Sequence, residues 1–174
     1  MTTIICSTNR KDSVTKVVAG IYQENLKELG VEAEVIDLRE LPEDFLVSAL
    51  YENSGKNESF NPVRETMMSS EKFVFIIPEY NGSFPGVLKL FIDGLKFPDT
   101  FTNKKCALVG VSSGIQGGVL AMSHMTDILN YCGTHVLSFK PKLSGISSKL
   151  EDGKITDERY NQYLKRQASE LKNF

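Results

Sequence analysis

The chain has 174 residues, of which 41% are hydrophobic and 24% charged, and its formal net charge is −2 at pH 7. These values are typical of a globular protein, so we expect a single domain spanning residues 1–174. The slightly acidic charge argues against nucleic-acid binding, and no apolar run is long enough to span a bilayer. Because the first residues lack a basic and then apolar targeting pattern, we expect a cytoplasmic protein.

The first predicted unit is a strand, a helix and a second strand. Residues 3–7 form an apolar strand that leads into a polar turn. The helix that follows carries an apolar stripe starting at Val14, with Ser13 as a suitable N-cap and Gly30 just beyond its end. Residues 31–37 alternate apolar and acidic side chains, which is typical of an outer strand. This order predicts a βαβ unit of a parallel sheet.

Residues 39–61 have weak periodicity and predict a long surface excursion. Four apolar residues are expected to order part of it: Phe45, Leu46, Leu50 and Tyr51. A short helix is predicted over residues 63–70. The apolar run 73–77 then predicts a buried central strand.

The second half of the chain continues the alternation. Apolar residues from Phe84 to Leu95 recur at helical spacing, residues 106–111 predict a strand, and residues 119–131 predict a helix. The last strand is expected over residues 134–139, followed by a turn around Asp152-Gly153 and a final helix capped by Thr156. The buried face of that helix is predicted to comprise Tyr160, Tyr163, Leu164, Ala168 and Leu171. Five strands alternating with helices predict a doubly wound, flavodoxin-like α/β fold with strand order 2-1-3-4-5.

Three polar loops follow the first, third and fourth strands, so they should meet at the carboxyl edge of the sheet. The first precedes a helix N-terminus, where hydroxyls, free N–H groups and the helix dipole favour an anion. The second holds Tyr80 and Asn81, which suit a flat heterocycle, and the third is rich in small residues. Each loop alone is also explained as an ordinary turn or cap, but together they predict a mononucleotide site.

The candidate binding residues come from these three loops, and neither a metal site nor a catalytic side chain is predicted. Cys6, Cys106 and Cys132 share no metal-type spacing, and both histidines stand alone. The first loop supplies Ser7, Thr8, Asn9, Arg10, Ser13 and Thr15. The second supplies Tyr80 and Asn81, and the third Ser112, Ser113, Gly114, Gln116, Gly117 and Gly118.

The segments 7–15, 78–89 and 112–118 resemble the NADPH-dependent FMN reductase family, which includes quinone, azo-dye and chromate reductases. The most specific part is Pro-Glu-Tyr-Asn at 78–81; Val14 stands where the family often has Asn. The resemblance implies that FMN occupies the three loops, takes hydride from NADPH or NADH, and passes electrons to a small acceptor such as a quinone. By position it also implies that four further residues bind FMN: Val14, through its backbone N–H, Pro78, Glu79 and Gly82. It also implies a homodimer or homotetramer.

Two alternatives remain open from the sequence. One is a flavodoxin-type electron carrier, although such carriers have a different phosphate loop and a strongly acidic surface. The other is a non-catalytic flavin-binding module. Reduction of the bound flavin by NADPH alone, and its reoxidation by small acceptors, would distinguish these alternatives.

Overall fold

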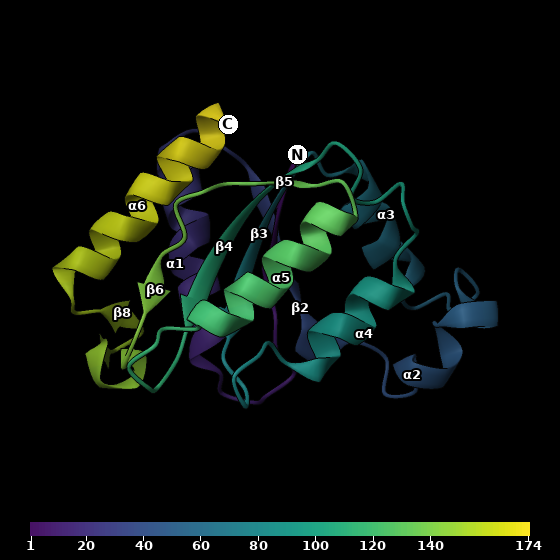
Figure 1. Cartoon of the computed structure of the whole chain (residues 1–174), viewed down its shortest axis with the longest axis horizontal. Helices are drawn as coiled ribbons and strands as arrows, with labels where there is room; N and C mark the ends of the chain where they lie inside the picture. Colours follow the sequence, from purple (N-terminus) through teal and green to yellow (C-terminus); the bar gives the residue numbers. More distant parts are fainter.

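A parallel sheet runs through the centre of the computed structural model, which describes residues 1–174 (Figure 1). Its order is β2-β1-β3-β4-β5, and a short sixth strand, β6, also pairs with β4. The strands are β1 (Thr2–Cys6), β2 (Ala33–Asp37), β3 (Lys72–Pro78), β4 (Lys105–Val111), β5 (His135–Val136) and β6 (Lys142–Leu143). All of these pairings are parallel, so the predicted fold class and strand order are confirmed.

Helices cover both faces of the sheet (Figure 1). The first face carries α1 (Val14–Glu28) and α6 (Glu158–Asn173); the other carries α3 (Asn61–Ser69), α4 (Gly86–Gly94) and α5 (Val119–Tyr131). Neighbouring side chains of β3 alternate between the two sides: Val74 joins the core under α1, and Phe75 joins the core under α4 and α5. The hydrophobic effect thus fixes the register, because a slip of one residue would exchange the two sets.

The excursion between β2 and α3 is folded into short turns. It contains η1 (Leu38–Glu40), α2 (Phe45–Ser48) and η2 (Tyr51–Asn53). Phe45 is buried, with its ring centroid 4.6 Å from that of Phe60, and Leu50 is buried as well. Leu46 and Tyr51 are 57% and 78% exposed, so the expectation that they order this segment is wrong.

The last predicted strand, over residues 134–139, is instead broken into β5 and β6. Pro141, just before β6, has no N–H to donate, although its carbonyl accepts from Gly110. The fully buried Gln167 of α6 fills the gap, because its Nε2 donates to Leu108 O at 2.9 Å and to Phe139 O at 2.6 Å. A side-chain amide therefore replaces the missing strand hydrogen bonds.

The segment after β6 holds η3 (Ile146–Lys149) and a hairpin of β7 (Leu150–Glu151) and β8 (Lys154–Ile155). Asp152 and Gly153 have φ values of 46° and 74°, as a type I′ turn requires, which agrees with the predicted turn. The N-cap of α6 is Asp157 and not Thr156: its carboxylate accepts from the Arg159 N–H at 3.0 Å. A second partner, Lys149 Nζ at 3.0 Å, holds that carboxylate in place.

Candidate functional site

The three polar loops meet at the carboxyl ends of β1, β3 and β4, at the lower edge of the molecule in Figure 1. They enclose an open recess of about 390 Å³. Its lining consists of Arg10, Asp12, Ser13, Val14, Thr15, Pro78, Glu79, Tyr80, Val111, Ser112, Ser113, Ile146 and Ser147. A recess of this size at the switch point of a doubly wound sheet is suited to a small ligand.

The first loop presents unpaired donors to the recess. Ser13 caps α1 by accepting from the Lys16 N–H at 3.4 Å. Neither the N–H of Val14 nor that of Thr15 donates a hydrogen bond within the chain. These two N–H groups stand at the positive end of a fifteen-residue helix, with the exposed Arg10 guanidinium on the same rim. The arrangement favours a phosphate or another anion.

The second loop is a tight hairpin turn. Tyr80 and Ser83 exchange two backbone hydrogen bonds, at 2.8 and 3.0 Å, and Asn81 and Gly82 between them have φ values of 52° and 73°. This Asn-Gly pair forms a type I′ turn, in which both central residues need positive φ. The turn holds Tyr80 at the recess and places Asn81 in solvent.

A side-chain hydrogen bond joins the first loop to the second. Thr8 Oγ1 and Tyr80 Oη are 2.7 Å apart, and the same Thr8 oxygen accepts from the Arg10 N–H at 3.2 Å. Thr8 is 1% exposed, so its hydroxyl is well shielded from water. The sequence places Thr8 among the hydroxyls of the first loop, but its hydrogen bond to Tyr80 was not predicted, because the two residues are distant in the sequence.

The third loop is shaped by close backbone contacts. Ser112 Oγ donates to Gly114 O at 2.8 Å and accepts from the Gly117 N–H at 3.0 Å. A Cβ added to Gly110 would lie 2.2 Å from Gly117 O, so only glycine fits there. Gly117 packs against Lys142 of β6. The loop is therefore anchored to the neighbouring strands.

A fourth wall comes from η3. Ile146 and Ser147 line the recess, and the Ile146 N–H donates to Ser112 O at 3.1 Å. The sequence held no signal for this wall, because the break between β5 and β6 that brings η3 to the recess was not predicted.

The recess also contains an unsatisfied carboxylate. Glu79 Oε2 is buried and has no hydrogen-bond partner, although Glu79 lines the opening. An unpaired buried acceptor is costly, so it favours a ligand that brings donors such as hydroxyl or ring N–H groups. Together with the free N–H groups of Val14 and Thr15, it fits a mononucleotide with a phosphate end and a polyol or ring end.

The predicted binding residues divide into those at the recess and those beside it. Nine line it: Arg10, Ser13, Val14, Thr15, Pro78, Glu79, Tyr80, Ser112 and Ser113. Ser7 is buried and donates to Ile5 O at 3.2 Å. Asn9, Asn81, Gly114 and Gln116 are exposed outside the lining, and Gly82 and Gly117 contact neighbouring chain segments. The contact of each residue with FMN stays a prediction.

Cys6 lies at the end of β1, next to the first loop. Burial, and then the negative charge of Asp37, raises the pKa of its thiol to about 11. At neutral pH this sulfur is a protonated thiol and a poor nucleophile.

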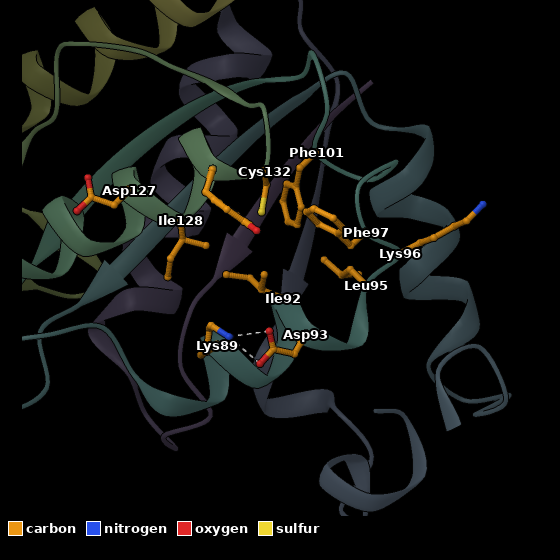
Figure 2. Close-up of a pocket in the computed structure, with 11 residues that line it drawn as sticks. Lys89, Ile92, Asp93, Leu95, Lys96, Phe97, Phe101, Asp127, Ile128 and Cys132 are labelled. Carbon is orange, nitrogen blue, oxygen red and sulfur yellow. Dashed lines mark hydrogen bonds and ion pairs between the residues drawn. The ribbon is translucent and has the colours of Figure 1, made fainter. Parts of the chain in front are cut away.

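A second cavity, of about 570 Å³, opens between α4 and α5, away from the three loops (Figure 2). Its lining is mostly apolar, and the exposed rings of Phe97 and Tyr131 stack there with centroids 6.3 Å apart. Lys89 and Asp93 form an ion pair at its rim, at 2.7 Å. This cavity has neither the free helix N–H groups nor the unpaired acceptor of the recess, so its lining does not suit a mononucleotide.

The fold and the recess define a flavodoxin-like protein with a candidate mononucleotide site at its carboxyl edge. Residues 2–140 match the family described as NADPH-dependent FMN reductase, so the chain belongs to that family. This membership confirms the predicted family, the class of flavin oxidoreductase, and FMN with NAD(P)H as its redox partners. The flavodoxin-type carrier is not favoured.

Relatives of known name support the assignment. The chain is 29% identical over 169 residues to an NAD(P)H:quinone oxidoreductase of Solanum tuberosum, covering 92% of this chain and 85% of that protein. It is 31% identical over 133 residues to an FMN-dependent NADPH-azoreductase of Staphylococcus aureus, covering 72% and 67%. Among solved structures, the flavoenzyme FerB from Paracoccus denitrificans superposes with a TM-score of 0.81 at 23% identity, covering 99% and 94% of the two chains. That likeness shows the shared fold.

Proposed function

We propose that the protein is a single-domain NAD(P)H-dependent oxidoreductase that holds FMN in the recess and reduces small acceptors such as quinones. The observation that carries this proposal is the recess itself, where unpaired N–H donors and an unpaired buried carboxylate face one opening. The names of the quinone reductase and azoreductase relatives give the acceptor class.

Each wall of the recess has a distinct role in holding FMN. The N–H groups of Val14 and Thr15, with Arg10, bind the phosphate. Glu79 accepts hydrogen bonds from the polyol chain or ring. Tyr80, fixed by Thr8, and Ser112 with Ser113 orient the flat ring.

FMN supplies the redox chemistry when bound, accepting hydride from the nicotinamide and returning electrons to the acceptor. The chain supplies position: the loops fix one side of the ring and leave the other accessible from the open side of the recess. No residue is required as an acid or base, and none of the lining residues is assigned that role.

The expected assembly is a homodimer or homotetramer. The apolar cavity between α4 and α5, with its exposed stacked rings of Phe97 and Tyr131, suits an interface with a second copy (Figure 2). No helix is long and apolar enough to cross a bilayer. We propose the cytoplasm as the site of action, since three free, buried thiols are compatible with a reducing compartment.

The direct test is the absorption spectrum of purified, FMN-loaded protein before and after anaerobic addition of NADPH or NADH. Bleaching of the flavin band, followed by its return on addition of a quinone, is the expected result. A flavin that stays oxidised with both donors contradicts the proposal. A flavin that is bleached but reoxidised only by oxygen contradicts the acceptor class.

A further inference from the structure

A third recess lies on the other side of α5, between that helix and the edge of the sheet. Its volume is about 370 Å³. It is lined by Val119, Met122, Ser123, Thr126, Asp127, Ser138, Lys140 and Lys142. The helix residues recur every three or four positions, and the edge residues alternate, so each set shares one face of its element. We call this cavity the edge recess.

The edge recess concentrates unpaired positive charge. Lys140 and Lys142 both line it, and neither forms an ion pair. The hydroxyls of Ser123 and Ser138 lie in the same lining and make no hydrogen bond within the chain. Two ammonium groups with nearby hydroxyl donors are a donor set suited to a phosphate dianion.

The backbone adds donors along the same edge. The N–H groups of Ser138 and Lys140 make no hydrogen bond within the chain, because they alternate with the N–H of Leu137, which donates to Cys106 O of β4. Free N–H groups at a sheet edge favour anions. One carboxylate, Asp127, shares the lining, but it also borders the apolar cavity and pairs with neither lysine. Figure 2 shows Asp127 set apart from the aromatic side chains of that cavity.

The edge recess is within reach of the proposed flavin site. Lys142 packs against Gly117 of the third loop, and Val119 begins α5 immediately after that loop. Thr126 lies seven residues further along α5, roughly 10 Å at about 1.5 Å per residue. An extended dinucleotide whose nicotinamide lies at the third loop could therefore place its adenosine end here.

We propose that the edge recess binds a phosphomonoester dianion, which in turnover is the 2′-phosphate of NADPH. This inference rests on the proposed function, because it assigns the donor of the same flavin site. Lys140 and Lys142 are then the residues that make the enzyme prefer NADPH to NADH. They are specificity-determining residues and take no part in hydride transfer.

The test compares the wild type with the double variant Lys140→Gln/Lys142→Gln in anaerobic stopped-flow reduction of the bound flavin. The apparent Kd for NADPH should rise about tenfold or more in the variant, because the charged hydrogen bonds to the 2′-phosphate are lost. The apparent Kd for NADH, which lacks this phosphate, should change less than about twofold. Inorganic phosphate should compete with NADPH in the wild type only. The matched control, Lys27→Gln/Lys154→Gln, removes the same charge from exposed positions elsewhere and should leave both constants unchanged.

Calorimetry gives an independent readout on FMN-saturated protein. Adenosine 2′,5′-bisphosphate should bind the wild type more tightly than adenosine 5′-monophosphate does, and the double variant should lose the difference. Equal loss for NADPH and NADH, no loss for either, or phosphate binding without a change in donor preference overturns the assignment. If the edge-recess assignment is overturned but NADH still reduces the flavin at the wild-type rate, the proposed function stays intact. If neither donor reduces the flavin of the wild type, both the proposed function and the edge-recess assignment are overturned.

Discussion

The hydrogen bond between Thr8 and Tyr80 predicts a measurable link between two loops of the proposed flavin site. Tyr80→Phe keeps the ring and removes only the hydroxyl that lies 2.7 Å from Thr8 Oγ1. A single side-chain hydrogen bond contributes about 0.5–1.5 kcal/mol, so the Kd for FMN should rise roughly 2- to 10-fold. Tyr80→Ala also removes the ring and should weaken FMN binding further.

The companion variant Thr8→Val is expected to be the more costly of the two. It removes the same bond and also leaves the Arg10 N–H without its acceptor at 3.2 Å. This second hydrogen bond also contributes about 0.5–1.5 kcal/mol, so its loss should lower the free energy of unfolding as well as FMN affinity. The double variant should be less destabilised than the sum of the singles, because both remove one shared bond.

The assay is fluorescence titration of FMN into apoprotein, with chemical denaturation of each variant in parallel. The control is His124→Ala, which removes another side-chain bond to the second loop, between Ser83 Oγ and His124 Nδ1 at 2.9 Å, outside the recess. That variant should bind FMN like the wild type. Strict additivity of Thr8→Val and Tyr80→Phe, or a loss of affinity in His124→Ala as large as that in Tyr80→Ala, would refute the reasoning.

Four further outcomes follow from the fold. Gln167→Leu should lower the free energy of unfolding by about 2–4 kcal/mol, since it leaves two buried carbonyls without a donor; denaturant titration measures this, and an unchanged midpoint contradicts it. Gly110→Ala should lower the free energy of unfolding by about 3 kcal/mol, because the added Cβ would lie 2.2 Å from Gly117 O. A stable variant with normal FMN affinity would contradict this close contact. The hydrogen bond from Lys149 lowers the pKa of Asp157 in the folded state. The stability that this bond provides is therefore present above the unfolded-state pKa and is lost as the pH falls through the folded-state pKa. The difference in stability between the wild type and Asp157→Asn should shrink on acidification, and a difference that grows contradicts this assignment. Exchanging residues 39–61 for the excursion of a relative should alter acceptor preference in steady-state assays and leave FMN affinity nearly intact; a large loss of FMN contradicts a role for this segment in acceptor choice alone.

Periodicity predicted the regular part of this fold because burial dictates it. The stripe from Phe84 to Leu95 became α4, residues 119–131 became α5 with the same bounds, and the apolar run 73–77 became the central strand. The spacing of apolar residues along each segment shows which side chains are buried, so these elements can be predicted from local sequence alone.

The features that were not predicted depend on partners distant in sequence. The break between β5 and β6 depends on Gln167, which lies more than twenty residues later in the chain and could not be paired with Phe139 in advance. The same holds for Thr8, whose role is set by Tyr80 at a separation of 72 residues. The cap of the last helix moved by one position because Lys149 favours Asp157.

The broken last strand also affects how the protein behaves at high concentration. A continuous outer strand offers a row of unpaired backbone groups on which a strand from another molecule can add. Here β5 and β6 present two residues each, with Pro141 between them and lysines on either side of it. This margin of the sheet is a poor template for intermolecular β-pairing, so the interruption protects the monomer surface from aggregation.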